Sequence, residues 1–328
     1  MSPAAVSRPL RRETPFEQVA ARLPDWMRPH LPRRWVQLGR VLLLRLPQAL
    51  EDERQPVAAA YATLPGVEAV MRRPRIGGEL RQPRLPQLLL GSSAETEVRE
   101  HGLRYRLDLQ RVMWAPGNVG WRAGPRGPTA VAALYAHPGP RAVLDCFAGV
   151  GYFALQFARH WPAAQVIAIE KNPVAAEYLR QNVVLNSLAN VEVIESDCRD
   201  VTREADIVHL GYIGGTCSFL QHSSDCLEPS GTIIFHEAYR NNWLGFRKRS
   251  DWNGTPAKFT ELMDEYGYEV EAFGRVKTYG PSSSHIIARL KKRDYTQTSF
   301  EAVNSLSASP VFVTPRGSTS IILHSFSA

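Results

Sequence analysis

Five short apolar runs recur through the second half of this 328-residue chain, and that recurrence constrains the fold more than any other feature. Segments with helical spacing separate the runs, which are residues 142–144, 166–169, 191–194, 207–210 and 232–235. Strands that alternate with helices pair in parallel and are covered on both faces, so they are continuously apolar. We therefore predict an α/β domain on a parallel sheet. Its clearest helix follows the capping residue Asn172 and begins at Pro173.

The residues before this sheet have a different organisation. Residues 1–30 contain five prolines and predict a mobile lead-in with one short helix. Residues 31–112 predict a small α+β domain with a strand to residue 44, a helix over 57–64, a strand over 67–71, a connector over 72–91 and a hairpin turning at His101-Gly102. The α/β domain is predicted over residues 113–293, and the Ser-rich residues 294–328 predict a flexible tail.

Positive charge is concentrated in the front of the chain. Residues 1–140 hold 21 Arg, no Lys and 12 acidic residues, a balance of +9, whereas the remainder carries −2. A cationic segment joined to a neutral one is typical of a nucleic-acid grip joined to a chemical domain, although genome composition can also favour Arg. The candidate RNA contacts are two tryptophans, for which core packing is the more common role, and a set of arginines in which the cluster at 72–75 is favoured: Trp26, Trp35, Arg33, Arg34, Arg72, Arg73 and Arg75.

Composition excludes several other classes of protein. No run of about 18 apolar residues exists, and the first residues lack the apolar core of a secretion signal, so we expect a cytoplasmic protein without a membrane span. The four cysteines show neither a C-x-x-C pair nor zinc spacing, which predicts reduced thiols and no metal. Oligomeric state cannot be read from the sequence, and a monomer is the default expectation.

A glycine turn follows the first apolar run. The segment 143–154 runs from a strand through Gly149 and Gly151 into a helix, and a missing side chain lets a backbone approach a ligand. Such ligands bind at the carboxyl ends of the strands. The spacing of Gly149, Gly151 and Ala154 also fits the relaxed dinucleotide fingerprint, so the glycines alone do not identify the ligand.

Three carboxylates refine the choice of ligand. Glu170 ends the second strand, where it can accept from ribose hydroxyls, unless it only caps the next helix. Asp197, with Cys198 beside it, follows the third strand, where it can accept from an adenine amino group, unless it only closes a turn. Asp145 precedes the glycines and would repel a pyrophosphate but suit a cation. S-adenosylmethionine (SAM) is therefore favoured over NAD.

These motifs resemble a known family. The segments 145–151, 169–173 and 197–200, together with Asn182 and Asn186, resemble class I SAM-dependent enzymes that modify guanosine 37 of transfer RNA. One branch of that family methylates N1 of the guanosine. The other, in wybutosine synthesis, transfers the 3-amino-3-carboxypropyl group of SAM to 4-demethylwyosine at position 37 of tRNA(Phe). The resemblance implies a Rossmann-like catalytic domain behind a small N-terminal α+β domain.

Several segments resemble the aminocarboxypropyl branch in particular. These are residues 31–35, 114–119, 210–212, 235–237 and 279–281 with His285. The methylating branch typically ends its fourth strand in Asn-Pro or Asn-Leu-Pro, whereas this chain has residues 209–212, His-Leu-Gly-Tyr. The match covers residues 31–292 and therefore both predicted domains.

The resemblance also implies a binding site. Arg122 would reach the carboxylate of the methionine moiety, although Ala115 replaces the serine of the family and Trp121 replaces an acid. The implied SAM-binding set is Ala115, Arg122, Phe147, Gly149, Glu170, Asp197 and Cys198, with no catalytic side chain, because the base attacks the activated carbon directly. The alternatives are N1-methylation, transfer to a non-RNA acceptor, and an RNA-binding relative with a vestigial pocket.

Overall fold

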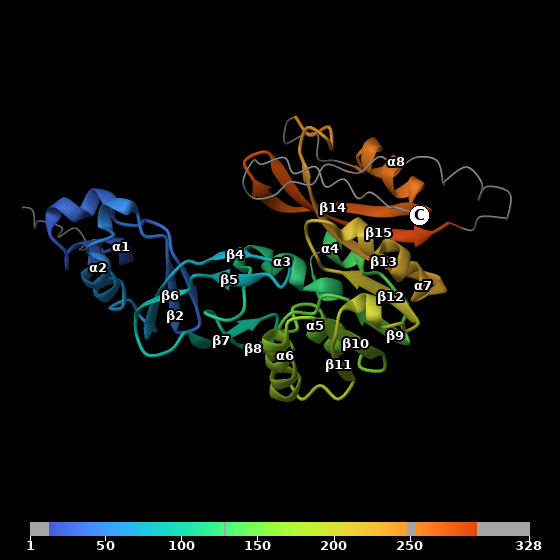
Figure 1. The fold of residues 1–328 in the computed structure, drawn as a ribbon, viewed down its shortest axis with the longest axis horizontal. Coiled ribbons are helices and arrows are strands. Elements are labelled where there is room, and N and C mark those ends of the chain that lie inside the picture. The colour runs from blue at the N-terminus through green and yellow to red at the C-terminus, as the bar shows by residue number, and fades with distance from the viewer. Residues whose placement is uncertain (1–12, 128, 248–253, 294–328) are drawn as a thin grey trace, which may run out of the picture. The chain divides into compact units, whose positions relative to one another are not determined.

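Residues 13–127, 129–247 and 254–293 are described in the computed structural model (Figure 1). The chain divides into two compact units, one of residues 1–99 and 106–114 and the other of residues 100–105 and 115–328. It passes from one to the other in the hairpin of β7 (Glu95–Glu100) and β8 (Leu103–Asp108), which turns at His101 and Gly102 as the sequence predicts. Residues 1–12 of the predicted lead-in and the predicted tail over 294–328 lie outside the described residues.

The first unit is built on a four-stranded sheet in the order β1-β2-β3-β6. Its strand, helix and strand order over residues 41–72 agrees with the prediction, because a short helix joins two parallel apolar strands. The elements of the unit are α1 (Pro15–Ala20), β1 (Val36–Leu38), β2 (Val41–Leu44), α2 (Arg54–Tyr61), β3 (Ala69–Arg72), β4 (Arg75–Gly77), β5 (Gln82–Arg84) and β6 (Gln87–Leu90).

Two parts of the first unit differ from the expectations. Val19 and Met27 are buried in the same core as the sheet, so the described part of the lead-in, from residue 13 onward, packs onto the domain. Thr14 starts α1 with a capping box, which the density of prolines obscures in the sequence. The connector over 72–91 contains three short strands, and β6 adds an antiparallel edge to the sheet.

The second unit contains a seven-stranded sheet in the order β11-β10-β9-β12-β13-β15-β14 (Figure 1). The five predicted apolar runs are its parallel strands: β9 (Ala142–Asp145), β10 (Gln165–Glu170), β11 (Val191–Glu195), β12 (Ala205–Leu210) and β13 (Leu227–Arg240). Two antiparallel strands extend the sheet beyond the predicted ones, β14 (Tyr268–Gly280) and β15 (Ser283–Lys292). The sheet is therefore mixed, with its parallel part as expected.

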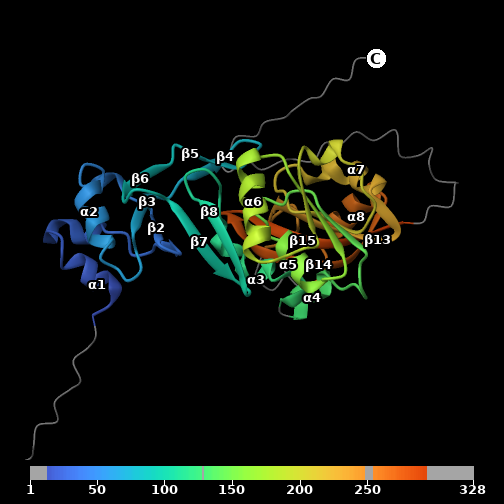
Figure 2. The same ribbon diagram turned by 90° about the horizontal axis from the view of Figure 1, so that it is seen from below.

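Helices cover both faces of this sheet. Phe259 and Met263 of α8 and Leu220 of α7 pack on the face that carries Val208 and Phe235. On the other face, Phe157 of α5 contacts His209 of β12. Figure 2 shows α5 on the opposite side of the sheet from α7 and α8. The helices are α3 (Val119–Arg122), α4 (Thr129–Leu134), α5 (Ala154–His160), α6 (Pro173–Leu185), α7 (Leu220–Asp225) and α8 (Ala257–Glu265). None of the described helices has the length and apolar character needed to cross a membrane.

Helix α6 begins as its sequence predicts. The Asn172 side chain accepts a hydrogen bond from the N–H of Val174 at 3.1 Å, and Pro173 occupies the first helical position. Asn182, on the buried side of α6, donates to the carbonyl of Val150 at 3.0 Å and so ties the helix to the glycine turn. Helix α6 therefore packs beside the turn that follows β9.

Candidate functional site

Three carboxylates lie at the carboxyl ends of three neighbouring strands. Asp145 is the last residue of β9, Glu170 is the last residue of β10, and Asp197 lies two residues beyond β11. The register pairs Ala168 with Asp145 and Glu170 with Glu195, so the ends of these strands are close to level. The structure therefore brings together the acids that the sequence predicts to form a ligand site.

The two glycines of the turn are required by the protein itself. Gly149 has φ +58° and Gly151 has φ +101°, the left-handed region that favours glycine. A Cβ on Gly149 would lie 2.5 Å from the ring of Tyr152, and one on Gly151 would lie 2.7 Å from Leu155. Backbone conformation and internal packing thus add to the ligand-approach argument made from sequence.

Glu170 fixes the turn and keeps acceptor capacity. One carboxylate oxygen accepts the N–H of Gly149 at 2.7 Å, and the other accepts the N–H of Asn172 at 2.7 Å. Burial raises the pKa of Glu170, and these two N–H groups oppose the rise. Glu170 therefore has the helix-capping role considered above. Each oxygen still has a lone pair that can accept a hydroxyl group.

Asp197 has the turn-closing role that the sequence left open. Its oxygens accept the N–H of Arg199, two guanidinium nitrogens of Arg199 at 2.9 and 2.7 Å, and the ammonium of Lys171 at 2.9 Å. The bond from Arg199 is the main reason that the pKa of Asp197 is lowered. These donors fill about four acceptor positions, so an adenine amino group would have to replace one of them. The thiol of Cys198 is free and buried, and it lies in hydrogen-bonding contact with the free thiol of Cys146.

Arg122 is buried and already holds a carboxylate. Its Nε and Nη2 donate to the two oxygens of Glu100, both at 2.7 Å, and its Nη1 donates to the carbonyl of Ala115 at 2.6 Å. The guanidinium also lies over the ring of Tyr152, 5.7 Å from its centroid. Sequence analysis missed Glu100, because nothing in its surroundings on the hairpin marks it as a partner. Arg122 is thereby oriented next to the glycine turn.

An aromatic cluster borders this site. The ring of Phe147 stacks on Tyr212 with centroids 4.9 Å apart, and Phe219 meets Phe147 edge-on, also at 4.9 Å. Phe147 follows β9 and Tyr212 follows β12, so the cluster joins two adjacent strand ends. Half-buried aromatic faces of this kind can stack on a nucleobase.

Glu237 fixes the loop that carries Tyr212. Its buried carboxylate accepts main-chain N–H groups of Gly214 at 2.6 Å and of Gly215 and Thr216 at 2.8 Å. Gly214 and Gly215 have positive φ, which lets successive N–H groups point to one anion. The sequence marked Glu237 only by family resemblance, and its role depends on a contact across 21 to 23 residues.

A chain of buried polar side chains leads away from Asp145. Nδ1 of His209 lies 3.0 Å from a carboxylate oxygen of Asp145, and Nε2 of His209 lies 3.3 Å from Nε2 of His236. Nδ1 of His236 then lies 3.0 Å from Nε2 of His285. All four side chains are at most 3% exposed. The described part of the chain contains no group of three or more His, Cys, Asp or Glu arranged to hold a metal ion, so the contacts are hydrogen bonds.

The residues present fit a sulfonium nucleoside. Glu170 keeps acceptors for ribose hydroxyls, and Phe147 offers a half-buried aromatic face. The second oxygen of Asp145 is buried without a hydrogen-bond partner among the described residues, so negative charge lies beneath the turn. That charge favours a cation and opposes a pyrophosphate.

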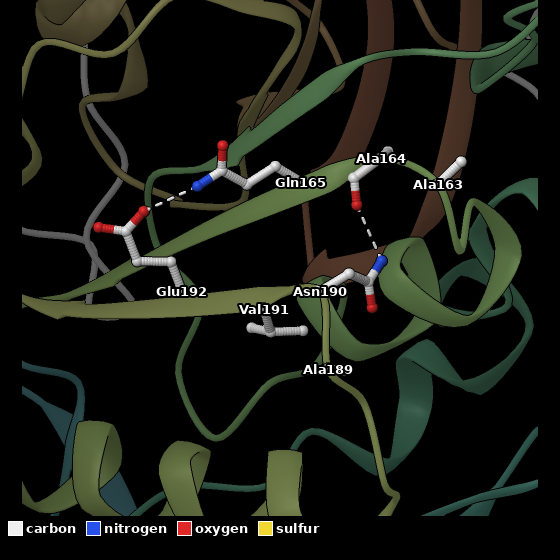
Figure 3. Close-up of a pocket in the computed structure, with 7 residues that line it drawn as sticks. All are labelled: Ala163, Ala164, Gln165, Ala189, Asn190, Val191 and Glu192. Carbon is white, nitrogen blue, oxygen red and sulfur yellow. Dashed lines mark hydrogen bonds between the residues drawn. The ribbon is translucent and has the colours of Figure 1, made fainter.

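A hollow at the opposite edge of the sheet does not have this chemistry. It measures about 320 Å³ and lies where β10 and β11 begin, at Gln165 and Val191 (Figure 3). The amide of Gln165 donates to Glu192 at 3.0 Å, and the amide of Asn190 donates to the carbonyl of Ala164 at 2.9 Å. Its polar groups are thus engaged with one another, and the carboxyl-end site is the candidate functional site.

The sheet order, the glycine turn and the acids at the strand ends define the chain as a Rossmann-like transferase of the SAM-dependent class. Residues 96–252 match the TRM5/TYW2 methyltransferase domain, and residues 16–94 match the TYW2 N-terminal domain. The chain belongs to the TRM5/TYW2 family, as its motifs predict.

Two curated relatives and one solved structure illustrate the similarity. A tRNA(Phe) (4-demethylwyosine(37)-C(7)) aminocarboxypropyltransferase of Pyrococcus horikoshii is 32% identical over 84% of this chain and 95% of its own length. The tRNA (guanine(37)-N(1))-methyltransferase Trm5b of Pyrococcus abyssi is 28% identical over 84% of this chain and 79% of its own. The crystal structure of P. horikoshii TYW2 in complex with MeSAdo has 31% identity and a TM-score of 0.67, covering 84% of this chain and 97% of that one.

Proposed function

We propose that this protein transfers the 3-amino-3-carboxypropyl group of SAM to C7 of 4-demethylwyosine at position 37 of tRNA(Phe). The observation that carries the proposal is the similarity to the P. horikoshii aminocarboxypropyltransferase, which extends over nearly the whole of that relative. The separate match of residues 16–94 to the TYW2 N-terminal domain supports the same branch. The end of β12 supports it as well, since His209, Leu210 and Gly211 stand where the methylating branch has Asn and Pro.

In this proposal the protein binds and orients, and the acceptor base attacks directly. Bound SAM supplies a sulfonium that activates the neighbouring γ-carbon of its amino-acid arm toward displacement. Glu170 accepts from the ribose, the turn at Gly149 lets the main chain approach, and the main chain at Ala115 and Cys198 lines the site. Asp197 accepts from the adenine in place of one of its present donors. Phe147 borders the nucleoside and Arg122, held by Glu100, faces the amino-acid arm. The rate then depends on placing the γ-carbon at the acceptor carbon.

Labelled SAM tests which carbon is transferred. Purified protein is incubated with tRNA(Phe) that carries either 4-demethylwyosine or unmodified guanosine at position 37, and with SAM labelled either on the methyl carbon or on the carboxyl carbon. We expect the RNA to gain only the carboxyl label and methylthioadenosine to form. Methyl label in tRNA that carries unmodified guanosine 37 would establish N1-methylation instead. SAM binding without transfer to either RNA, and without methylthioadenosine, would leave the non-RNA acceptor or the vestigial pocket.

The arginines of the first unit divide into engaged and available ones. Arg72 is engaged, because its guanidinium bonds both oxygens of Glu51 and the amide of Gln87. Trp35 meets Tyr61 edge-on at 5.5 Å and packs on the core, which favours its structural role. By contrast Trp26 is 55% exposed, so it can still stack on a base.

Arg45 and Arg73 form the best candidate phosphate contact. The parallel register pairs Leu44 with Arg72, and the N–H of Arg73 continues the ladder to the carbonyl of Leu44 at 2.7 Å. The two arginines therefore follow adjacent strands at the same level. Burial and the neighbouring charge of Arg45 lower the pKa of Arg73. Within the described residues neither guanidinium has an acidic partner. Two adjacent unpaired cations suit a phosphate anion.

Salt dependence of tRNA binding tests this contact. Changing Arg45 and Arg73 to Ala is expected to weaken binding and to lower the slope of log affinity against log salt by about one per arginine. The exposed Arg22→Ala variant, in the turn after α1, is the matched control. An unchanged slope in the double variant would remove these residues from the interface. Contact with the anticodon region, the monomeric state and the cytoplasmic location stay predictions.

A further inference from the structure

The buried histidines described above are not used by the proposed binding roles. They lie on four adjacent strands, because Asp145 ends β9 and His209, His236 and His285 belong to β12, β13 and β15. The register pairs His209 with Asp145 and with Ile234, His236 with Ile287, and Ala238 with His285. From His209 on, each step therefore moves two residues farther toward the carboxyl edge. Steps of two keep every side chain on one face of the sheet.

The hydrogen-bond partners fix the direction in which protons are held. A carboxylate can only accept, so Nδ1–H of His209 donates to Asp145. In the direction that this sets, Nε2–H of His236 donates to the lone pair on Nε2 of His209. His236 in turn accepts Nε2–H of His285 on its Nδ1. All three donors thus point toward Asp145, and Nδ1 of His285 is left with a lone pair.

The surroundings of His236 and His285 keep these two rings neutral. The ring of Phe153 lies 4.4 Å from that of His209 and 5.5 Å from that of His236, measured between centroids. Burial lowers the pKa of His236 and lowers the pKa of His285 to about 3. The Nδ1 atom of His285 is buried and has no hydrogen-bond partner among the described residues. A neutral ring with one unused basic nitrogen can accept a proton and release another from its far side.

We propose that Nδ1 of His285 accepts the proton that the target base loses and that His236 and His209 pass a proton on to Asp145. This inference rests on the proposed aminocarboxypropyl transfer. The acceptor carbon forms a bond to the γ-carbon, while the carbon–sulfur bond breaks and its electron pair stays on sulfur. The C–H bond at the acceptor carbon then breaks, its electron pair returns to the ring, and its proton passes to His285. Three further transfers along the hydrogen bonds restore neutral histidines and leave Asp145 protonated.

Charge balance supports Asp145 as the end of this relay. Before transfer the site holds the positive charge of the sulfonium and the negative charge of Asp145. After transfer the sulfur is neutral, so a buried carboxylate would lose its counter-charge and its ionised form would be disfavoured. When Asp145 takes up the proton, its negative charge is lost in the same reaction as the positive charge of the sulfonium, so the site has no net charge before or after transfer. His285 is the group that meets the substrate, and His236 and His209 are positioning residues.

Single-turnover kinetics with deuterium at C7 of the target base test the relay. His285→Gln can still donate to His236 but cannot accept and forward a proton, so its rate is expected to fall at least about 100-fold. Proton removal then limits the rate, so a primary isotope effect should appear that wild type lacks. His222→Gln is the matched control, since His222 bonds only locally to the carbonyl of Val201 and to Cys226 and should keep the wild-type rate. A variant with the wild-type rate and no isotope effect would overturn the relay.

A second measurement does not depend on activity. Nitrogen-15 spectra of the histidine side chains should show three neutral rings at pH 7, with the proton on Nδ1 of His209 and on Nε2 of His236 and His285. A charged ring, or a proton on Nδ1 of His285, would contradict the proposal even if the Gln variant fails to fold. Failure of the proposed function is seen separately, because wild type would then transfer no aminocarboxypropyl group to the RNA.

Discussion

The carboxyl edge of the sheet holds acidic side chains over β9, β10 and β11, here called the charged half, and imidazoles over β12, β13 and β15, the histidine half. On the first half, every acid is oriented by N–H groups or cations, as Glu170 is by the glycine turn and Asp197 by Arg199. On the second half, three rings are buried among aromatic side chains. Asp145 belongs to both halves. The difference agrees with our two proposals, that the acidic half binds the nucleoside of SAM and that the histidines carry a proton out of contact with water.

In the charged half, the largest expected effect on stability comes from breaking the ion pair of Arg122 and Glu100. Glu100→Ala leaves a buried guanidinium without its carboxylate, which should destabilise the second unit by about 3–5 kcal/mol. Replacing both residues with Met should recover part of this loss. Thermal unfolding followed by calorimetry measures both variants. Glu195→Ala removes an exposed pair with Arg180 and should cost less than about 1 kcal/mol. Equal losses of stability in the two Ala variants would show that burial does not make the pair of Arg122 and Glu100 more important than an exposed pair.

Replacing Glu170 tests the contribution of the charged half to nucleoside binding. Glu170→Ala removes two charge-assisted bonds to the turn and the acceptors for the ribose, each bond to a charged group contributing about 1.5–3 kcal/mol. We expect SAM affinity to fall about 10- to 150-fold by calorimetric titration. Glu177→Ala, on the exposed side of α6, should leave the affinity unchanged. The same affinity in both variants would move the ribose contact away from β10.

Acidity should affect the two halves in different pH windows. The pKa of His236 and that of His285 are lowered by burial, so unfolded chains bind protons that the folded protein does not. Stability is therefore full above about pH 6.5 and falls as pH decreases toward 3, by about 1.4 kcal/mol per pH unit per histidine. The lowered pKa of Asp197 instead supports stability that is lost only below its usual range near 3.8.

Melting temperatures at pH 7.5, 6.0 and 5.0 measure this contrast. Replacing His236 and His285 together with Gln should flatten the fall in melting temperature over that range. Two charged groups face the row of histidines: Lys277, whose charge helps to lower the pKa of His285, and Asp145, which contacts His209. Both are retained in this variant. A wild-type protein whose melting temperature does not change between pH 7.5 and 5.0 would contradict neutral buried rings.

The charged half could be predicted from sequence, and the histidine half could not. Glu170 follows the run 166–169 directly and Asp197 comes three residues after the run 191–194, so the position of a strand end places both acids. His209 lies inside an apolar run, whereas His236 follows one and His285 follows three serines, and only the register between strands shows that these rings touch across 27 and 49 residues. A polar residue in a run such as 207–210 is a signal for a buried network, but it does not name the partner. Strands β14 and β15 were missed because most of β14 is half-buried and carries charged residues.

The stacked pair of Phe147 and Tyr212 joins the two halves and gives the smallest expected effect. An aromatic pair contributes about 0.5–1.5 kcal/mol beyond its buried area, so Tyr212→Leu and Phe147→Leu should show a coupling of that size in a double-mutant cycle on unfolding. Trp243→Leu, which disrupts the separate stack with Tyr239, should show no coupling to Phe147→Leu. If coupling between Phe147 and Tyr212 is absent, the stack does not help to hold the loop after β12, and the bonds of that loop to Glu237 hold it without this contribution.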